Sequence, residues 1–151
     1  MGESMEGRYL TFSLEKEVYG IEITKIREII GIQKITHVPK TPEFVEGVIN
    51  LRGKVVPVVD LRKKFGLPAS EYTRETCIIV VEVHDSLMGV IVDTVIEVAR
   101  IPMDAFNEVP SFGGSVPIEY IQGICQSGGK VVIVLDIESV LSKEEMQAAM
   151  M

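Results

Sequence analysis

Two segments of this sequence occur twice. Residues 9–32, which begin YLTFSL, align without a gap with residues 78–101 at an offset of 69. Residues 43–65, which begin EFVEGV, align without a gap with residues 119–141 at an offset of 76. The offset changes because the connector between the two segments is seven residues longer in the second copy. The chain is therefore a duplication, and its fold must be one that two similar units can build together.

Each copy carries five short apolar segments, bounded by turn residues, that are typical of β-strands. The chain has 21 valines and 18 isoleucines, and β-branched residues favour strands. We predict strands at residues 8–14, 18–23, 28–36, 44–50 and 54–60 in the first copy and at 77–83, 87–92, 95–101, 120–126 and 130–136 in the second. Short helical turns are predicted at 24–27 and 61–66, and a proline- and glycine-containing loop at 102–117.

The expected fold class is mostly β. Five short strands without a helix to cover an open sheet favour closure into a small barrel, because closure removes exposed edges. A barrel of roughly 65 residues is marginally stable alone, so we expect two barrels packed on each other, with a shared apolar seam and a groove between them. Residues 1–151 would form a single domain with a first repeat at about 8–66, a second at about 77–141 and a C-terminal helix at about 138–150. The pattern leaves open whether strands are exchanged between the barrels.

Composition excludes several functional classes. The net charge of −7 and the pI near 4.9 argue against a nucleic-acid surface, which requires a basic stripe. No apolar run approaches the roughly 20 residues that span a bilayer, and the polar, acidic start predicts no signal peptide. Two cysteines without close spacing predict neither a disulfide framework nor a metal site. We therefore expect a cytosolic, reduced protein without direct membrane insertion.

The duplication provides an internal control for single residues. A residue kept in both copies is expected to serve the fold, whereas a residue present in one copy needs another reason. Gly53 and Gly129 match, as do Asp60 and Asp136, so we expect structural turn and capping roles for them. Cys125 aligns with Ile49, an apolar strand position, and is expected to be a small buried side chain.

Arg52 is the candidate functional residue that this control singles out. The second copy has Gln126-Ser127-Gly128 in place of Asn50-Leu51-Arg52, so the turn itself needs no arginine. A guanidinium is a planar, permanently charged fork suited to a carboxylate. Glu28 is one candidate partner, although its counterpart in the second copy, Glu97, has no matching arginine. The alternative is that Arg52 is a solvated charge on a turn.

Residues 38–66, VPKTPEFVEGVINLRGKVVPVVDLRKKFG, resemble the CheW family of bacterial chemotaxis coupling proteins, and the similarity extends over nearly the whole chain. The resemblance implies two five-stranded SH3-like barrels with a short C-terminal helix and no catalytic activity. It further implies a bridge between the histidine kinase CheA, through its regulatory domain, and the cytoplasmic tip of methyl-accepting chemoreceptors. Such proteins reside in the cytoplasm at inner-membrane receptor arrays. The resemblance also implicates Arg52 and Glu28 in coupling.

A receptor tip is a long helical hairpin, and its apolar stripe could lie in the groove between the barrels. The predicted partner-binding residues are Ile26, Glu28, Ile29, Ile30, Gly47, Val48, Asn50 and Arg52. For the kinase we expect a barrel-to-barrel interface on the second copy. No cofactor is expected, and an enzyme would need converging ionisable residues that the sequence lacks. The remaining alternative is a carrier with a small molecule inside a barrel, which low aromatic content disfavours.

Overall fold

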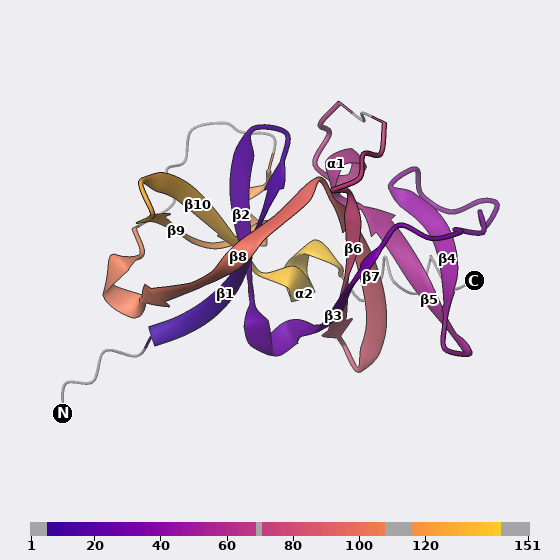
Figure 1. The fold of residues 1–151 in the computed structure, drawn as a ribbon, viewed down its shortest axis with the longest axis horizontal. Coiled ribbons are helices and arrows are strands. Elements are labelled where there is room, and N and C mark those ends of the chain that lie inside the picture. Colours follow the sequence, from indigo (N-terminus) through magenta and orange to yellow (C-terminus); the bar gives the residue numbers. More distant parts are fainter. Residues whose placement is uncertain (1–5, 69–70, 108–115, 143–151) are drawn as a thin grey trace.

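The computed structural model describes residues 6–68, 71–107 and 116–142, and ten strands in this part of the chain form two five-stranded sheets (Figure 1). The first sheet has the order β8-β1-β2-β10-β9 and the second the order β3-β6-β7-β5-β4. The strands of the first sheet are β8 (Thr94–Pro102), β1 (Glu6–Leu14), β2 (Glu17–Glu22), β10 (Lys130–Leu135) and β9 (Ile121–Ser127). Those of the second are β3 (Ile26–Gly31), β6 (Cys77–Val83), β7 (Ser86–Val92), β5 (Lys54–Asp60) and β4 (Val45–Leu51).

Each sheet is built from strands of both repeats. When every strand is replaced by its repeat counterpart, the order of the first sheet becomes that of the second, which confirms the duplication. The parallel pair β10·β2 places Val134 opposite Gly20, and the parallel pair β5·β7 places Val58 opposite Gly89, at matching repeat positions. The chain crosses from the first sheet to the second between β2 and β3 and returns between β7 and β8. The structure thus answers the question that the sequence left open: strands are exchanged.

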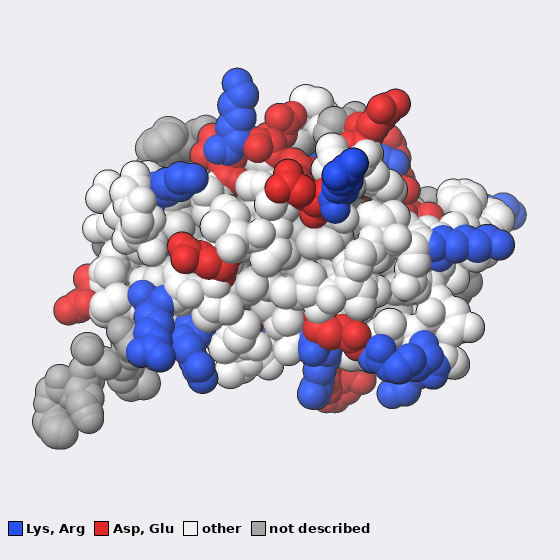
Figure 2. Space-filling view, viewed as in Figure 1, with Lys and Arg blue, Asp and Glu red and all other residues white. Residues whose placement is uncertain are grey.

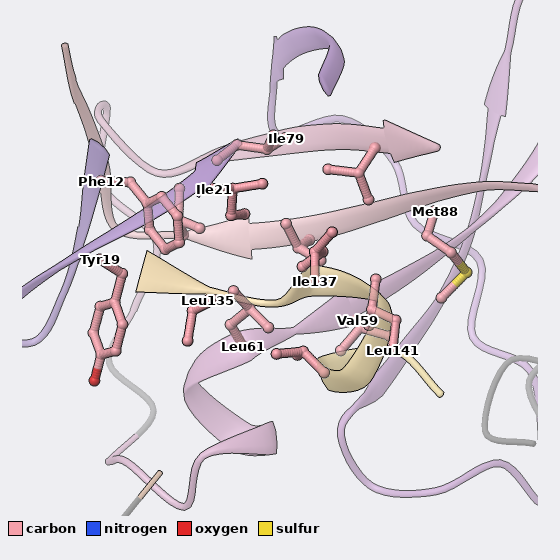
Figure 3. Packing of buried hydrophobic residues seen from close by; sticks show 14 of the residues in the cluster. Phe12, Tyr19, Ile21, Val59, Leu61, Ile79, Met88, Leu135, Ile137 and Leu141 are labelled. Atoms are coloured by element: carbon pink, nitrogen blue, oxygen red, sulfur yellow. The ribbon is translucent and has the colours of Figure 1, made fainter. Parts of the chain in front are cut away.

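Three apolar clusters fill the molecule. One lies within the first sheet and includes Tyr9, Cys125 and Val134, and a second lies within the second sheet. The largest takes side chains from both sheets and from two one-turn helices, α1 (Leu61–Lys64) and α2 (Ile137–Val140) (Figure 3). This cluster is the shared apolar seam that the sequence predicted, and full burial of each such side chain contributes about 1.5–3 kcal/mol. The burial of Cys125, at 0% exposure, is also confirmed.

The structure departs from the predicted elements at three places. The strand predicted at 28–36 ends at Gly31, because the chain then leaves β6 and crosses toward β4, where Thr36 forms an isolated bridge with Val48. Of the helix predicted at 138–150, α2 forms the first turn, and residues 143–151 lie outside the described residues. The loop predicted at 102–117 contains one turn of 3-10 helix at Met103–Ala105, and residues 108–115 also lie outside.

The residues matched between the repeats have the structural roles that the sequence predicted. Asp60 accepts a hydrogen bond from the backbone N–H of Arg62 (2.9 Å) at the start of α1, and Asp136 accepts one from that of Glu138 (3.2 Å) at the start of α2. Such a cap satisfies a helix N–H group that has no partner within the helix. The matched glycines Gly53, in the β4–β5 turn, and Gly129, in the β9–β10 turn, have positive φ angles of 88° and 80°.

Candidate functional site: the β3–β4 edge

The predicted partner-binding residues lie on the two outer strands of the second sheet and on the turn that follows β4. Ile26, Glu28, Ile29 and Ile30 belong to β3, Gly47, Val48 and Asn50 to β4, and Arg52 to the β4–β5 turn. The segment after β3 joins the two edges. Thr36 and Val48 exchange backbone hydrogen bonds of 2.8 and 2.9 Å, and the Gln33 side-chain amide donates to the Asn50 carbonyl (3.2 Å). The closure of the sheet therefore brings the predicted β3 and β4 residues to one edge.

Arg52 forms an ion pair with Glu28 across this edge. One guanidinium nitrogen of Arg52 lies 3.3 Å from Oε1 of Glu28, and the other donates to Oε2. The hydrogen bond from Arg52 lowers the pKa of the Glu28 carboxyl, and the same bond raises the pKa of Arg52. The Arg52 side chain is 70% exposed and that of Glu28 is 29% exposed. The two side chains are thus paired but open to solvent, so a partner can reach both charges.

The backbone of Arg52 shows that the turn does not favour this residue. Arg52 has φ of 50°, in the left-handed region, and its repeat counterpart Gly128 has φ of 60°. Glycine adopts this conformation at no steric cost, whereas an L-residue with a Cβ is disfavoured there by about 1–2 kcal/mol. Asn50 by contrast supports the turn, because its side-chain oxygen accepts a hydrogen bond from the Gly53 N–H (2.8 Å). The arginine is therefore retained against the preference of the backbone.

Gly47 has a steric role at the same edge. Its φ is 145°, and a Cβ at this position would lie 2.1 Å from the carbonyl oxygen of Thr36. At the matching position of the second copy, a Cβ on Gly123 would meet the Phe106 ring at 2.8 Å, which is a side-chain contact. The second copy has a matching backbone bridge between Asn107 and Ile124. Its glycine faces a side chain, whereas Gly47 faces backbone atoms, so the closer approach of two backbone segments in the first copy is the one that requires glycine.

The apolar members of the predicted set do not share one exposed face. Ile29 is 44% exposed, whereas Ile26 packs partly against the seam and Ile30 partly against the interior of the second sheet. Successive strand residues point to opposite faces, so Ile29 projects away from the side of Glu28 and Ile30. Val48 is half-buried. The exposed features of this edge are thus Ile29 on one face of β3 and the Arg52–Glu28 pair on the other.

A family model described as the CheW-like domain matches residues 8–145. The chain belongs to the CheW-like domain family. It is 38% identical over 145 residues to the chemotaxis protein CheW of Klebsiella aerogenes, covering 96% of this chain and 87% of that protein. It is 34% identical over 148 residues to CheW of Bacillus subtilis, covering 98% and 92%. The crystal structure of the scaffolding protein TtCheW from Thermoanaerobacter tengcongensis is similar with a TM-score of 0.85, at 35% identity, covering 93% of this chain and 96% of that one.

Within this CheW-like domain, Gln33 and Thr36 also belong to the β3–β4 edge, although neither was among the predicted site residues. Both hold β4 to the segment after β3, through a side-chain amide and a backbone bridge. The only sequence signal for Thr36 was the strand predicted at 28–36. That prediction implied that the backbone near Thr36 pairs with another strand, but it did not identify β4 as that strand. In the described ranges no group of three or more His, Cys, Asp or Glu side chains could hold a metal ion. No helix in those ranges has the length and apolar character needed to cross a membrane.

Proposed function

We propose that this chain is a chemotaxis adaptor that couples methyl-accepting receptors to the histidine kinase CheA in the cytoplasm. The observation that carries the proposal is the exposed Arg52–Glu28 pair on a CheW-like domain. The relatives of the chain are named chemotaxis protein CheW, and its solved relative is titled a scaffolding protein. An adaptor needs accessible groups on a stable frame; the exposure of the Arg52–Glu28 pair and the apolar core shared by the two sheets support this proposal.

The receptor tip would contact the β3–β4 edge. Ile29 offers an apolar contact on one face of this edge and Arg52 a charge on the other, so a helical hairpin with an apolar stripe flanked by polar residues would reach both by packing along the edge itself. Arg52 stays bonded to Glu28 in the free protein and has further N–H groups for a carboxylate of the receptor. The regulatory domain of the kinase would dock on the first sheet, where β8, β9 and β10 of the second copy lie. The protein then holds receptor and kinase in register at the inner-membrane array, without chemistry of its own.

Reconstitution tests this proposal. The chain is mixed with the regulatory domain of CheA from the same organism and with a receptor signalling fragment, and complexes are separated by gel filtration. We expect co-elution with each partner and, when full-length CheA replaces its regulatory domain, a higher kinase phosphorylation rate with all three proteins present. Absence of co-elution with either partner, together with saturable binding of a metabolite, would instead support a carrier.

A further inference from the structure

Two arginines lie directly opposite each other on β1 and β8. The register pairs Arg8 with Arg100, and both side chains are exposed. Like charges in directly opposite cross-strand positions destabilise a sheet. Figure 2 shows Lys and Arg side chains gathered where β1 begins and β8 ends, in a protein whose net charge is −7. Something other than folding therefore favours this arrangement.

The repeat counterparts of this pair carry no charge. The offset of 69 places Cys77 at the position of Arg8 and Gly31 at that of Arg100, and the register of β3 and β6 pairs Gly31 with Cys77. The same strand pair thus forms without arginines.

Among the described side chains neither arginine has an acidic partner, whereas four other cations on the described surface do. Lys25 pairs with Glu138, Arg27 with Glu82, Arg52 with Glu28 and Lys63 with Glu46. The Arg8–Arg100 pair is therefore a local concentration of positive charge.

Exposed apolar residues continue the same strand. Val98 is 49% exposed and, two residues before Arg100, projects from the same face of β8. Ile96, at the bulge of this strand, is 43% exposed. β8 is an outer strand of its sheet and spans nine residues. Long apolar edge strands are normally covered or charged, because they pair readily with other chains.

We propose that Arg8 and Arg100, with Val98 and Ile96, form a docking face for a partner protein that presents paired carboxylates beside apolar side chains. Two guanidinium groups can bind a pair of carboxylates through charge-assisted hydrogen bonds. The net negative charge of the chain repels an acidic partner. Such a partner is therefore expected to bind where a local basic pair lies next to an apolar strip. This face lies on the first sheet, away from the β3–β4 edge on the second.

The test uses two probes. The first is the CheA regulatory domain, a choice that rests on the proposed function, and the second is a synthetic peptide of alternating valine and glutamate, which does not. The variant Arg8→Glu/Arg100→Glu is compared with Lys16→Glu/Lys54→Glu, which changes the net charge equally at two exposed lysines of the β1–β2 and β4–β5 hairpins. Binding is measured by calorimetry for the domain and by NMR titration for the peptide, at low and high salt.

We expect the arginine variant to lose about tenfold or more in affinity for both probes at low salt, while the lysine control changes less than about twofold. The loss should shrink at high salt, because exposed charges are screened. Arg100→Glu alone places opposite charges across the strands, so it should melt no lower than the unmodified protein and still lose binding. This variant separates recognition from folding.

Equal losses in the arginine and lysine variants, or no loss with the peptide, would overturn the proposal even if the kinase domain binds elsewhere. Failure of the unmodified chain to bind the kinase domain while the peptide binds through Arg8 and Arg100 would overturn the adaptor function and leave the docking face standing. Concentration-dependent self-association that the arginine variant abolishes would make a second copy the occupant and would likewise overturn the proposal.

Discussion

Arg62 donates two parallel hydrogen bonds to Asp60 in the interior of the protein. Nε of Arg62 lies 3.1 Å from Oδ1 and a terminal nitrogen lies 3.0 Å from Oδ2, with the two side chains 2% and 1% exposed. A third nitrogen of Arg62 reaches Asp93 at 3.4 Å, where the chain passes from β7 to β8. The guanidinium therefore ties α1 to one of the two crossings between the sheets.

Arg62→Ala should destabilise the protein strongly, because it leaves Asp60 as a buried carboxylate without its cation. Loss of one partner of a buried ion pair costs about 3–5 kcal/mol, and urea unfolding at neutral pH measures this. The matched control is Glu138→Ala, at the same repeat position in the second copy. Glu138 pairs with Lys25, and both side chains are partly exposed, at 43% and 34%, so its loss should cost at most about 1 kcal/mol. Equal losses of unfolding free energy in the two variants would show that burial of the Arg62–Asp60 pair adds nothing to its effect on stability.

Arg52→Gly should fold as well as the unmodified protein and fail in signalling. Glycine relieves the left-handed backbone at this position, as Gly128 does in the second copy. Thermal unfolding should therefore shift by no more than a few degrees, while the kinase phosphorylation rate in receptor–kinase complexes should fall well below that of the unmodified chain. Arg52→Ala keeps the Cβ, removes the charge and serves as the control for backbone freedom. Normal kinase activation in both variants would make Arg52 a solvated turn charge.

Gly47→Ala should damage the fold more than Gly123→Ala, although the two glycines match in the repeats. Alanine at Gly47 would drive a Cβ into the Thr36 carbonyl, at a φ that L-residues rarely adopt. Backbone strain and overpacking together predict a loss of roughly 2–4 kcal/mol. At Gly123 the obstacle is the Phe106 ring, which can rotate. Chemical denaturation of both variants gives the comparison, and a larger loss at Gly123 would contradict it.

Alkaline pH should weaken the protein through Tyr19. Burial, with a smaller contribution from Glu17, raises the pKa of Tyr19 from 10.0 to about 12. The unfolded chain thus deprotonates first, so the free energy of unfolding is unaffected well below pH 10 and falls as the pH rises from 10 to 12. At pH 11 this linkage removes about 1.4 kcal/mol. Tyr19→Phe should lose correspondingly less stability between pH 8.5 and pH 11, and identical pH profiles would contradict this account.

The positions of the strands could be predicted because runs of β-branched residues lie between turn residues in both copies. The exchange of strands between the two sheets could not be predicted. β2 pairs in parallel with β10, yet β5 is the repeat counterpart of β10 and has the same alternation of apolar residues. Pairing with either strand would bury similar side chains, so a single sequence does not distinguish them.

The residues of the candidate site were likewise only partly predictable from the sequence. Glu28 could be named from the sequence as one candidate partner of Arg52, with a solvated turn charge as the alternative, and the structure forms the pair. Arg8 and Arg100 could not be paired from the sequence, because they become neighbours only through the β1·β8 pairing, which the exchange creates. The approach of Gly47 to Thr36 likewise depends on a path of the chain that no local pattern describes.

The exchange also has an evolutionary consequence. A single repeat that kept the pairing seen here would have left β3 without a partner and β1, β2 and β5 with one partner each, and it would have completed its sheets by assembling as an intertwined homodimer. Joining two such genes end to end made the assembly intramolecular and freed it from dependence on concentration. A homodimer must show the same surface twice. After fusion each half could mutate alone, so one molecule could evolve an arginine at one end and an arginine pair at the other, and present two unlike faces to two unlike proteins.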